Sequence, residues 1–489
     1  MQTKRIFAAV SVTAVLAGLT YFASSFKFDT IKIGQQPEAA ALAVGAKDLS
    51  VACPGSALRL GGVTGLKVGK IDRFGSAKGL VATNTQFGES FQQLDLDSKV
   101  SSILSDGPAT SFNGFSSVAG TKFTVIDPTK TAPQSSEVLS ATQFEAIGDS
   151  VNGLAAAACV VPGNEQWLLG AQTSTGREAL LVLENPSAIA STISLQIYTE
   201  GGLLSGSGLN GIAVPANTTT VIPLASLAPK AATMALHVTS RGGEIAAWVQ
   251  QRATRGTQTG GIDFISNSQV EASTISIPGL NIVGSAEAAK LAVNNPDFED
   301  LAPSLDVFVA GKKNAQLTIQ IIGADDQSYG TVVTASATAG RVTQVKLPGL
   351  QDGNYSIVVD SDQPIRAQAN FNRLSRTKKF DLAFALAVAP TSQPRLSVTA
   401  GTAKSKLNLV NAGNEVAMVT IEINRTKTSV LKVASHSSSV INLPQGSSVK
   451  VSSDQPVAAS LVFDQDGLVS SVPMLDYQNL GQKISVVVR

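Results

Sequence analysis

The phrase Ser361-Asp362-Gln363-Pro364-Ile365-Arg366-Ala367 returns later in the chain as Ser453-Asp454-Gln455-Pro456-Val457-Ala458-Ala459. Each copy follows a run in which apolar and polar residues alternate, at 355–359 and at 449–451. A looser version stands at 237–247. A strand, a tight turn and a second strand, used three times, predict a tandem array of similar β domains.

Length and composition limit the class of protein. The chain has 489 residues, which is too many for one core and enough for several domains. It holds 37 Lys and Arg against 36 Asp and Glu, so no bias toward nucleic acid is expected. Val, Ile, Thr, Ser, Ala and Gly dominate, a composition that suits sheets joined by many turns.

The N-terminal segment predicts export. Lys4 and Arg5 precede an uncharged stretch at 6–26, which Lys27 closes. A helix of this length just crosses a hydrocarbon core of roughly 30 Å. We therefore expect residues 1–26 to form a single-pass membrane anchor, with the N-terminus cytoplasmic and the bulk of the chain extracytoplasmic. A cleaved signal peptide ending near 23–25 is the alternative, and it makes the protein secreted.

The two cysteines, Cys53 and Cys159, agree with export. An exported pair is usually joined in a disulfide, here closing a long loop. A metal site is disfavoured, because two thiols so far apart, with no histidine nearby, lack the spacing of metal ligands.

Turn residues and repeats divide the remaining chain. We expect a stalk at 27–50, an N-terminal extracytoplasmic region at 51–165, and β-sandwich modules at 166–278, 279–394 and 395–489. The first and last modules share a pattern: eight residues separate a turn asparagine from the next strand, Asn185 to Ile193 and Asn411 to Val419. In the middle module 291–296 imitates the first strand, so its register is open. The region 51–165 fits the repeats poorly, and a helix is expected between 136 and 154.

Period-two alternation with one polar face is typical of antiparallel strands that cover a sandwich core. Strands about every ten residues, with turn residues between them, favour an all-β fold of tandem immunoglobulin-like or fibronectin-like sandwiches. No βαβ rhythm is visible, which disfavours a Rossmann fold or an α/β barrel.

Signals of catalysis are weak. His237 lies within a strand and His436 in a polar turn, and neither has a neighbouring Gly-x-Ser-x-Gly motif. Asp297, Glu299 and Asp300 lack the spacing of a calcium loop. We therefore expect no catalytic residue, no metal site and no cofactor.

A few residues suggest a binding surface. Trp248 is able to stack on a sugar ring, although packing in a core is the favoured interpretation. The basic residues Arg373, Arg376, Lys378 and Lys379 suit an anionic wall polymer or lipid headgroups, with a solvated hairpin end as the alternative.

The chain resembles an uncharacterised family of actinobacterial exported proteins, best over residues 51–280. The resemblance rests on the following motifs: Cys53-Pro54-Gly55, Ala158-Cys159, Trp167-Leu168-Leu169-Gly170-Ala171-Gln172, Gly176-Arg177, Leu183-Glu184-Asn185-Pro186, Leu227-Ala228-Pro229, Gly242-Gly243-Glu244-Ile245-Ala246-Ala247, Gly260-Gly261-Ile262-Asp263 and Ile277-Pro278-Gly279. It implies an N-terminal membrane segment and a place in the cell envelope, but no activity and no functional residues.

Two functions of different class follow. The first is a non-catalytic, membrane-tethered β-sandwich protein that binds an envelope protein or cell-wall polymer, or acts as a scaffold or spacer. The alternative is a carboxylate-dependent enzyme that acts on an envelope glycan, which requires two acids held across a cleft. A cleft with facing acids favours the enzyme, whereas separate, smooth domains favour the binding protein.

Overall fold

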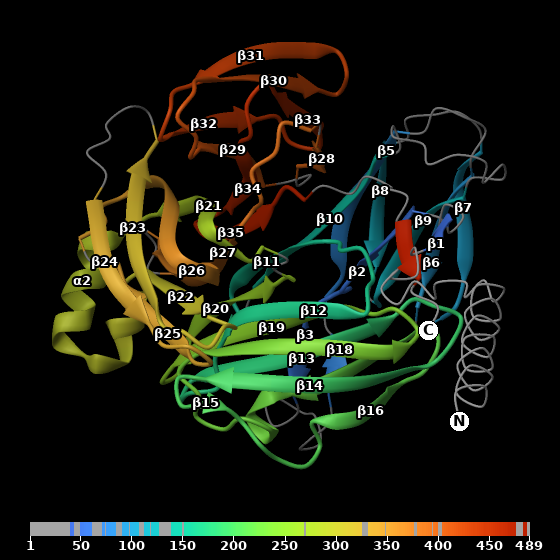
Figure 1. Cartoon of the computed structure of the whole chain (residues 1–489), viewed down its shortest axis with the longest axis horizontal. Coiled ribbons are helices and arrows are strands. Elements are labelled where there is room, and N and C mark those ends of the chain that lie inside the picture. The colour runs from blue at the N-terminus through green and yellow to red at the C-terminus, as the bar shows by residue number, and fades with distance from the viewer. Residues whose placement is uncertain are drawn as a thin grey trace, which may run out of the picture. The chain divides into compact units, whose positions relative to one another are not determined.

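The computed structural model describes residues 40–43, 49–60, 71–73, 75–84, 90–96, 98–106, 112–117, 119–126, 138–148, 151–267, 270–324, 331–347, 349–375, 379–393, 395–399, 403–475 and 483–486. The all-β class expected from the sequence is confirmed, since these residues form antiparallel sheets with a single α-helix among them (Figure 1). Residues Ala46–Leu480 form one compact unit.

The strands of this unit fall into four consecutive groups. Group 1 contains β2 (Leu49–Cys53), β5 (Ala77–Asn84), β6 (Ser90–Asp95), β7 (Ser101–Asp106), β8 (Phe112–Ser117), β9 (Thr121–Ile126), β10 (Val138–Ile147) and β11 (Gly153–Ala158), with a small β3 (Leu58–Leu60) and β4 (Ile71–Arg73) pair. Group 2 contains β12 (Glu165–Ala171), β13 (Arg177–Asn185), β14 (Ser191–Thr199), β15 (Gly202–Leu203), β16 (Asn210–Val214), β17 (Thr218–Pro223), β18 (Met234–Gly242), β19 (Ala246–Arg255) and β20 (Gln258–Ile265), with η1 (Leu224–Ser226) after β17.

Groups 3 and 4 follow in the same way. Group 3 contains β21 (Ala272–Ile282), β22 (Ser304–Phe308), β23 (Ala315–Gly323), β24 (Thr331–Ala337), β25 (Val342–Lys346), β26 (Gly353–Leu374) and β27 (Phe380–Leu386), with α2 (Ser285–Asn294) and η2 (Pro296–Leu301) after β21. Group 4 contains β28 (Arg395–Val398), β29 (Lys404–Asn411), β30 (Ala417–Ile423), β31 (Lys427–Val433), β32 (Ser437–Leu443), β33 (Ser448–Ser453), β34 (Ala458–Gln465) and β35 (Leu468–Pro473).

All four groups have the same strand order. In group 4, one sheet runs β28-β33-β30-β31 and the other runs β32-β29-β34-β35. Group 1 repeats this order as β2-β9-β6-β7 and β8-β5-β10-β11, and group 2 does so as β12-β18-β14-β16 and β17-β13-β19-β20. In group 3 the first half of the long β26 belongs to one sheet and its second half to the other. The order there is β21-β26-β23-β24 in the first sheet and β25-β22-β26-β27 in the second. The region 51–165, which fits the repeats poorly in sequence, is therefore a fourth copy in topology.

The repeated phrase carries the chain from one sheet to the other. In group 4 it joins β33 of one sheet to β34 of the other. In group 3 it lies inside β26, whose first half pairs with β23 and whose second half pairs with β22. The tight turn expected there is wrong, because the two strands do not pair with each other. The aspartate of each copy accepts a hydrogen bond from a backbone N–H group. Asp362 accepts from the backbone N–H of Gln316 at 2.8 Å, and Asp454 accepts from the backbone N–H of Met418 at 2.7 Å.

Other local expectations need correction. The helix expected at 136–154 is wrong, since β10 and β11 occupy the described part of that range. Residues 142–145 of β10 are all buried, so both faces of the strand are covered and the alternation by which a strand is recognised is absent. The expected boundary at 278/279 lies within β21, which pairs with β26 across that point. Residues 291–296, which imitate a strand, belong to α2 and η2, and these pack against the ends of β26 and β27.

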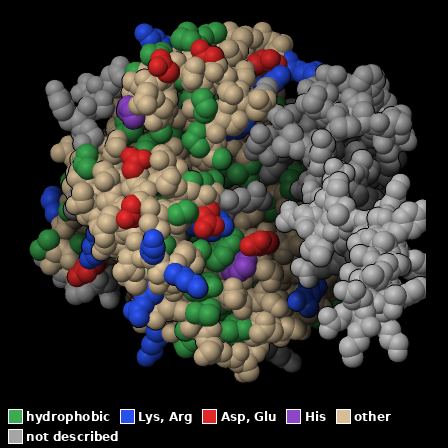
Figure 2. All heavy atoms as spheres, viewed as in Figure 1, with side chains coloured by type: hydrophobic (Ala, Val, Ile, Leu, Met, Phe, Trp, Pro, Cys, Tyr) green, Lys and Arg blue, Asp and Glu red, His purple; other side chains and the backbone are tan. Residues whose placement is uncertain are grey.

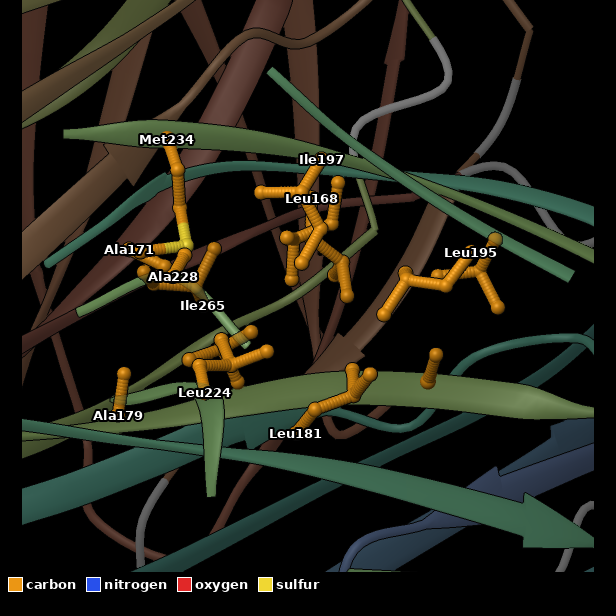
Figure 3. Packing of buried hydrophobic residues seen from close by; sticks show 14 of the residues in the cluster. Leu168, Ala171, Ala179, Leu181, Leu195, Ile197, Leu224, Ala228, Met234 and Ile265 are labelled. Atoms are coloured by element: carbon orange, nitrogen blue, oxygen red, sulfur yellow. The ribbon is translucent and has the colours of Figure 1, made fainter. Parts of the chain in front are cut away.

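The core of group 2 lies between its two sheets. Ile193, Leu195 and Ile197 alternate inward along β14, as their spacing predicts. Figure 3 shows side chains of the two layers meeting, with Leu168, Leu195 and Ile197 on one side and Leu181 on the other. The core also takes in side chains of β27 from group 3. The groups are therefore not independently packed domains.

The remaining described strands, β1 (Ala40–Ala43) and β36 (Lys483–Val486), pair with each other in antiparallel register. Among the described residues there is no helix with the length and hydropathy required to span a membrane. The expected anchor at 1–26 lies outside the described residues, and so does most of the expected stalk.

The turn asparagines of the repeats are structurally equivalent. Asn185 ends β13 and Asn411 ends β29, and both are fully buried. The Asn411 amide donates hydrogen bonds to the carbonyls of Glu415, Val433 and Ala434, and its oxygen accepts one from Gly413. Asn185 forms the same kind of bridge to Ile189 and Val214.

Replacing Asn411 with alanine is expected to lower the free energy of unfolding by about 2–4 kcal/mol, because it leaves buried carbonyl groups without a donor. The exposed Asn442, on a neighbouring strand, provides the matched control, and Asn442→Ala is expected to change stability by less than about 0.5 kcal/mol. Chemical denaturation of both variants measures the difference. Equal effects at the two positions contradict the bridging role of Asn411.

Candidate functional site

The predicted disulfide is confirmed: Cys53 and Cys159 are bonded to each other. Cys53 ends β2 and Cys159 directly follows β11, so the bond links the two sheets of group 1. Both residues are fully buried. The bond is a structural cross-link, and it closes a loop with a sequence separation of 106 residues.

Trp248 is fully buried, so the favoured interpretation, packing in a core, is confirmed, and a place on the binding surface is wrong. Both faces of β19 are covered. Ala247 and Val249 lie in the core of group 2, whereas Trp248 packs into a second core with residues of group 1. The indole N–H donates a hydrogen bond to the Ala158 carbonyl at 3.4 Å. Trp248 therefore joins two repeats.

The basic run does not form the expected surface in its described part. Arg373 is 1% exposed and forms an ion pair with Asp464 at 2.8 Å, while it also donates to the Leu468 carbonyl and to Asn281. It therefore anchors β26 to group 4 and is unavailable to a polymer. Lys379 is exposed, and its backbone pairs with Ser375. Arg376 and Lys378 lie outside the described residues.

The histidines have structural contacts. The His237 ring stacks on Trp167 at 4.2 Å between ring centroids and hydrogen-bonds to Gln196 and Glu165. Arg366 lies 4.7 Å from the Trp167 ring centroid and pairs with Glu271. His436 bonds to Asn414 at 2.9 Å. Trp167 is thus engaged by side chains of the chain itself.

Charged side chains on the surface are mixed in sign. On the face drawn in Figure 2, Lys and Arg side chains are interspersed with Asp and Glu side chains. Within the described ranges, no group of three His, Cys, Asp or Glu side chains is placed to hold a metal ion.

The last strand of every group lies at the edge of its sheet, and these four strands meet. β11 contacts β20, β20 contacts β27, β27 contacts β35, and β35 contacts β11. The strands can be followed by their labels in Figure 1. We call this ring of four edge strands the hub. Edge strands carry unpaired backbone N–H groups that need acceptors when they are buried.

Two buried aspartates supply acceptors at the hub. Asp263 of β20 accepts hydrogen bonds at Oδ1 from the amides of Ala156 and Phe264, and the Ser470 hydroxyl donates to its carboxyl group. Asp381 of β27 accepts hydrogen bonds at Oδ2 from the backbone amides of Leu154 in group 1 and Val469 in group 4. Its carboxyl group also accepts hydrogen bonds from the backbone amides of Ile262 in group 2 and Leu382 in group 3. Each carboxyl group therefore joins three or more repeats.

The environment of these acids favours the protonated form. Burial raises the pKa of Asp381 to about 8, and its backbone hydrogen bonds oppose this rise. Burial also raises the pKa of Asp263 well above its ordinary value, and the nearby Asp381 raises it further. Both side chains are 0% exposed. Because both carboxyl groups are buried and accept hydrogen bonds from backbone amides, the pair suits a structural role.

A pocket of about 220 Å³ lies between groups 2 and 3. We call it the seam pocket. Group 2 contributes Gln172, Arg177 and Gln251, and the rest comes from η2, β22, β25, β26, β27 and the residues beside them. Its lining combines buried apolar side chains with amides and charges, which are Gln172, Arg177, Gln251, Glu299, Asp300, Ala302, Ser304, Gln344, Lys346, Asn370, Phe371, Asn372, Leu382, Ala383 and Phe384.

The charged groups at the seam pocket are paired within the chain. Asp300 bonds to Arg177 and lies 2.7 Å from Nη2 of Arg255, which packs over the rings of Phe298 and Phe380. Lys346 lies 3.6 Å from Glu299. Burial, and to a smaller extent the positive charge of the neighbouring Arg177, lower the pKa of Arg255 to about 9.

A buried acid orients the amides of the pocket. Asp306 is fully buried, and it accepts hydrogen bonds from the side-chain amides of Gln344 and Asn370. Because the Gln344 amide nitrogen is bound in this way, its carbonyl oxygen is left as the acceptor. Burial raises the pKa of Asp306 to about 6.

Residues 115–453 match the sequence profile of DUF5719, a family of unknown function. The chain belongs to this family. The DUF5719 match includes the hub acids Asp263 and Asp381 and the described lining of the seam pocket, but it excludes Cys53 and Ser470. Membership agrees with the resemblance to an uncharacterised family noted from the sequence.

Other comparisons add little to the DUF5719 assignment. No curated protein matches the chain. A crystal structure of Thermotoga maritima 1070 is 15% identical, with a TM-score of 0.19, and covers 24% of this chain and 92% of its own. An anti-sigma factor domain-containing protein from Clostridium clariflavum is 8% identical, with a TM-score of 0.12, and covers 79% of this chain and 98% of its own.

The sequence contained partial signals of both sites. Gln172, Arg177 and Asp263 lie in motifs on which the resemblance rests, but those motifs alone indicated no chemistry. Asp381 stands between Phe380 and Leu382, and an acid inside an apolar strand is a signal of a buried, hydrogen-bonded group. The Asp300 pairing depends on residues distant in sequence, so spacing does not reveal it.

Proposed function

We propose that this protein is a non-catalytic, membrane-tethered extracytoplasmic protein that binds a component of the bacterial cell envelope. The basic residues Lys4 and Arg5, followed by the apolar stretch at 6–26, support an N-terminal transmembrane anchor. The Cys53–Cys159 disulfide supports an oxidising compartment outside the cytoplasm. The repeated pair of sheets supports an arrangement of tandem immunoglobulin-like sandwiches, and the family resemblance supports an actinobacterial origin.

The seam pocket is the observation that carries a binding role. It is concave, lies at a junction of two repeats, and combines amides with an apolar base, as ligand sites commonly do. The charges that line it are held in ion pairs with one another or with Arg255. A general acid or nucleophile has to exchange protons or bonds with a substrate, and a group fixed in such a pair is poorly suited to do so. The pocket therefore suits recognition without turnover.

A scaffold role is compatible with this proposal, because the hub and Arg373 join the repeats into one unit. The glycan-enzyme alternative has less support. Its strongest candidate pair, Asp263 and Asp381, is fully buried and engaged with backbone amides.

Incubation of the full-length protein with isolated envelope material separates the two functions. We expect the protein in detergent micelles to sediment with envelope fragments, while the concentration of reducing sugar ends in the supernatant stays at the level of a protein-free control. A time-dependent release of reducing ends supports the enzyme and overturns the proposal. Absence of co-sedimentation overturns it as well.

A further inference from the structure

We propose that the seam pocket binds a neutral saccharide unit through hydroxyl groups. This inference rests on the proposed envelope-binding function and names the ligand class of the same site.

The pocket offers unused hydrogen-bonding groups beside buried apolar surface. The backbone of Gln172 is held by the side chain of Gln251, with the Gln172 amide donating to it at 2.8 Å and the Gln172 carbonyl accepting from it at 3.2 Å. Gln172 lines the pocket, and its side-chain amide has no hydrogen-bond partner among the described residues. Gln344 and Ser304 belong to the same lining, and their side chains carry an amide carbonyl and a hydroxyl group. Amides and hydroxyls are able both to donate and to accept, as sugar hydroxyls require.

The size of the pocket limits the ligand. A volume of about 220 Å³ is smaller than that of typical drug-sized sites, which suits one ring rather than an oligomer. Phe384 is 4% exposed and lies opposite Asn370 in the register of β26 and β27, on the same face of the sheet, so its ring contributes apolar surface at the base. The ring of Phe371 packs on the other face, in the core of group 3. The apolar surface of Phe384 suits the C–H face of a sugar ring.

The charges argue for a neutral ligand. An anion bound at Arg177 has to compete with Asp300, and a cation bound at Glu299 has to compete with Lys346. A further positive charge is carried by Arg255, which also pairs with Asp300. Its side chain is 1% exposed and packs against the rings of Phe298 and Phe380, so a ligand has little access to it. A charged ligand therefore gains little here, whereas a neutral one leaves the ion pairs intact.

The probes for the test are the methyl glycosides of glucose, galactose, mannose and arabinose, with glucuronate as an anionic and glucosamine as a cationic comparison. Binding to the full-length protein is measured by saturation-transfer NMR. For a ligand of this size we expect a Kd on the order of 1 mM for at least one neutral glycoside. The charged probes are expected to bind more weakly.

Variants locate the binding. Gln172→Ala removes the unused amide but keeps the backbone contacts to Gln251, and it is expected to weaken binding about fivefold to tenfold. Ala302→Phe places a ring on the exposed Ala302 at the pocket, and it is expected to abolish binding. Gln316→Ala changes an exposed glutamine outside the pocket and serves as the control, with unchanged affinity expected.

Binding of none of the neutral glycosides overturns the inference, as does stronger binding of a charged probe. Neutral binding that Gln172→Ala and Ala302→Phe leave unchanged also overturns it, because the site then lies elsewhere. Thermal unfolding of each variant checks that it is folded. If the Ala302→Phe variant still sediments with envelope fragments, saccharide binding in the seam pocket is refuted, while the proposed envelope-binding function stands. If the unmodified protein does not sediment with envelope fragments, the proposed function and the saccharide site are both refuted.

Discussion

Replacing Asp381 with asparagine is expected to lower the free energy of unfolding by about 3–5 kcal/mol, whereas the same change at Asp263 is expected to cost less than about 1 kcal/mol at neutral pH. The two acids are neighbours in the hub, both are 0% exposed, and both substitutions preserve shape. The two acids differ in the hydrogen-bond donors that contact their carboxyl oxygens. The pair therefore forms a matched comparison.

Backbone amides surround the Asp381 carboxyl group. Oδ2 accepts from Leu154 at 3.0 Å and Val469 at 2.9 Å, and Oδ1 accepts from Leu382 at 2.9 Å. Whichever way an asparagine is turned, its NH₂ group faces at least one N–H donor. A protonated acid is less disruptive, because its hydroxyl oxygen keeps some capacity to accept.

Asp263 has a different pattern. Only Oδ1 accepts from backbone amides, while the Ser470 hydroxyl reaches Oδ2 at 3.0 Å. Because a hydroxyl is able to turn and accept, Ser470 accommodates the NH₂ group that Asp263→Asn introduces. Equal losses of stability in Asp381→Asn and Asp263→Asn, measured by chemical denaturation, contradict this account of the hub.

The dependence on pH gives a second measurement on the same variants. Because burial raises the pKa of both acids in the folded state, the folded protein retains protons that the unfolded chain has released above about pH 4. The contribution of these acids to stability is therefore complete below that pH and is lost as the pH rises through their raised pKa values, which for Asp381 means toward about 8. Asp263→Asn removes one of these groups, so we expect the difference in stability between this variant and the unmodified protein to shift in favour of the variant as the pH is raised from 5 to 8. A relative loss over this range contradicts the direction of the shift.

Gly261→Ala is expected to destabilise the protein by about 3–5 kcal/mol, which rivals the effect at Asp381. Gly261 has φ +111°, a conformation that side chains rarely adopt. A Cβ atom there lies 2.5 Å from Oδ1 of Asp381 and 2.5 Å from the backbone nitrogen of Leu382. The added carbon therefore forces β20 and β27 apart at the hub.

Gly256 provides the control for backbone strain alone. Its φ is +59°, and an added Cβ has no described atom within 4 Å. Gly256→Ala is expected to cost about 1 kcal/mol, which is the strain of a left-handed residue without a clash. Denaturation of the two variants tests whether close approach, rather than φ, decides the cost. Similar losses at both glycines contradict close packing of the hub.

Local patterns in the sequence predicted the strands well where one face of a strand is polar. Ile193, Leu195 and Ile197 alternate inward as expected, and the spacing from Asn185 and Asn411 identified equivalent turns. Where both faces are buried, the pattern disappears. β10 is such a strand, because residues 142–145 are all buried, and it occupies most of the range in which a helix is expected.

Contacts between repeats were not predictable from the sequence, because they join residues far apart in the chain. Arg373 looked like part of a solvated basic run, yet its partner Asp464 lies in another repeat. The seam pocket depends in the same way on Gln172 and Asn370 being brought together from two repeats. The repeated phrase occupies equivalent positions in groups 3 and 4, but its role as a crossing between sheets depends on pairing that no local pattern specifies.

We expect a saccharide to bind in the seam pocket, and covalent labelling locates the bound sugar directly. The full-length protein is irradiated with a neutral hexose glycoside that carries a diazirine group, with and without excess unlabelled glycoside, and labelled peptides are identified by mass spectrometry. We expect competed labels at 172–177, 299–304 and 370–372. Competed labels confined to other parts of the chain, or no competed label at all, rule out binding in the seam pocket.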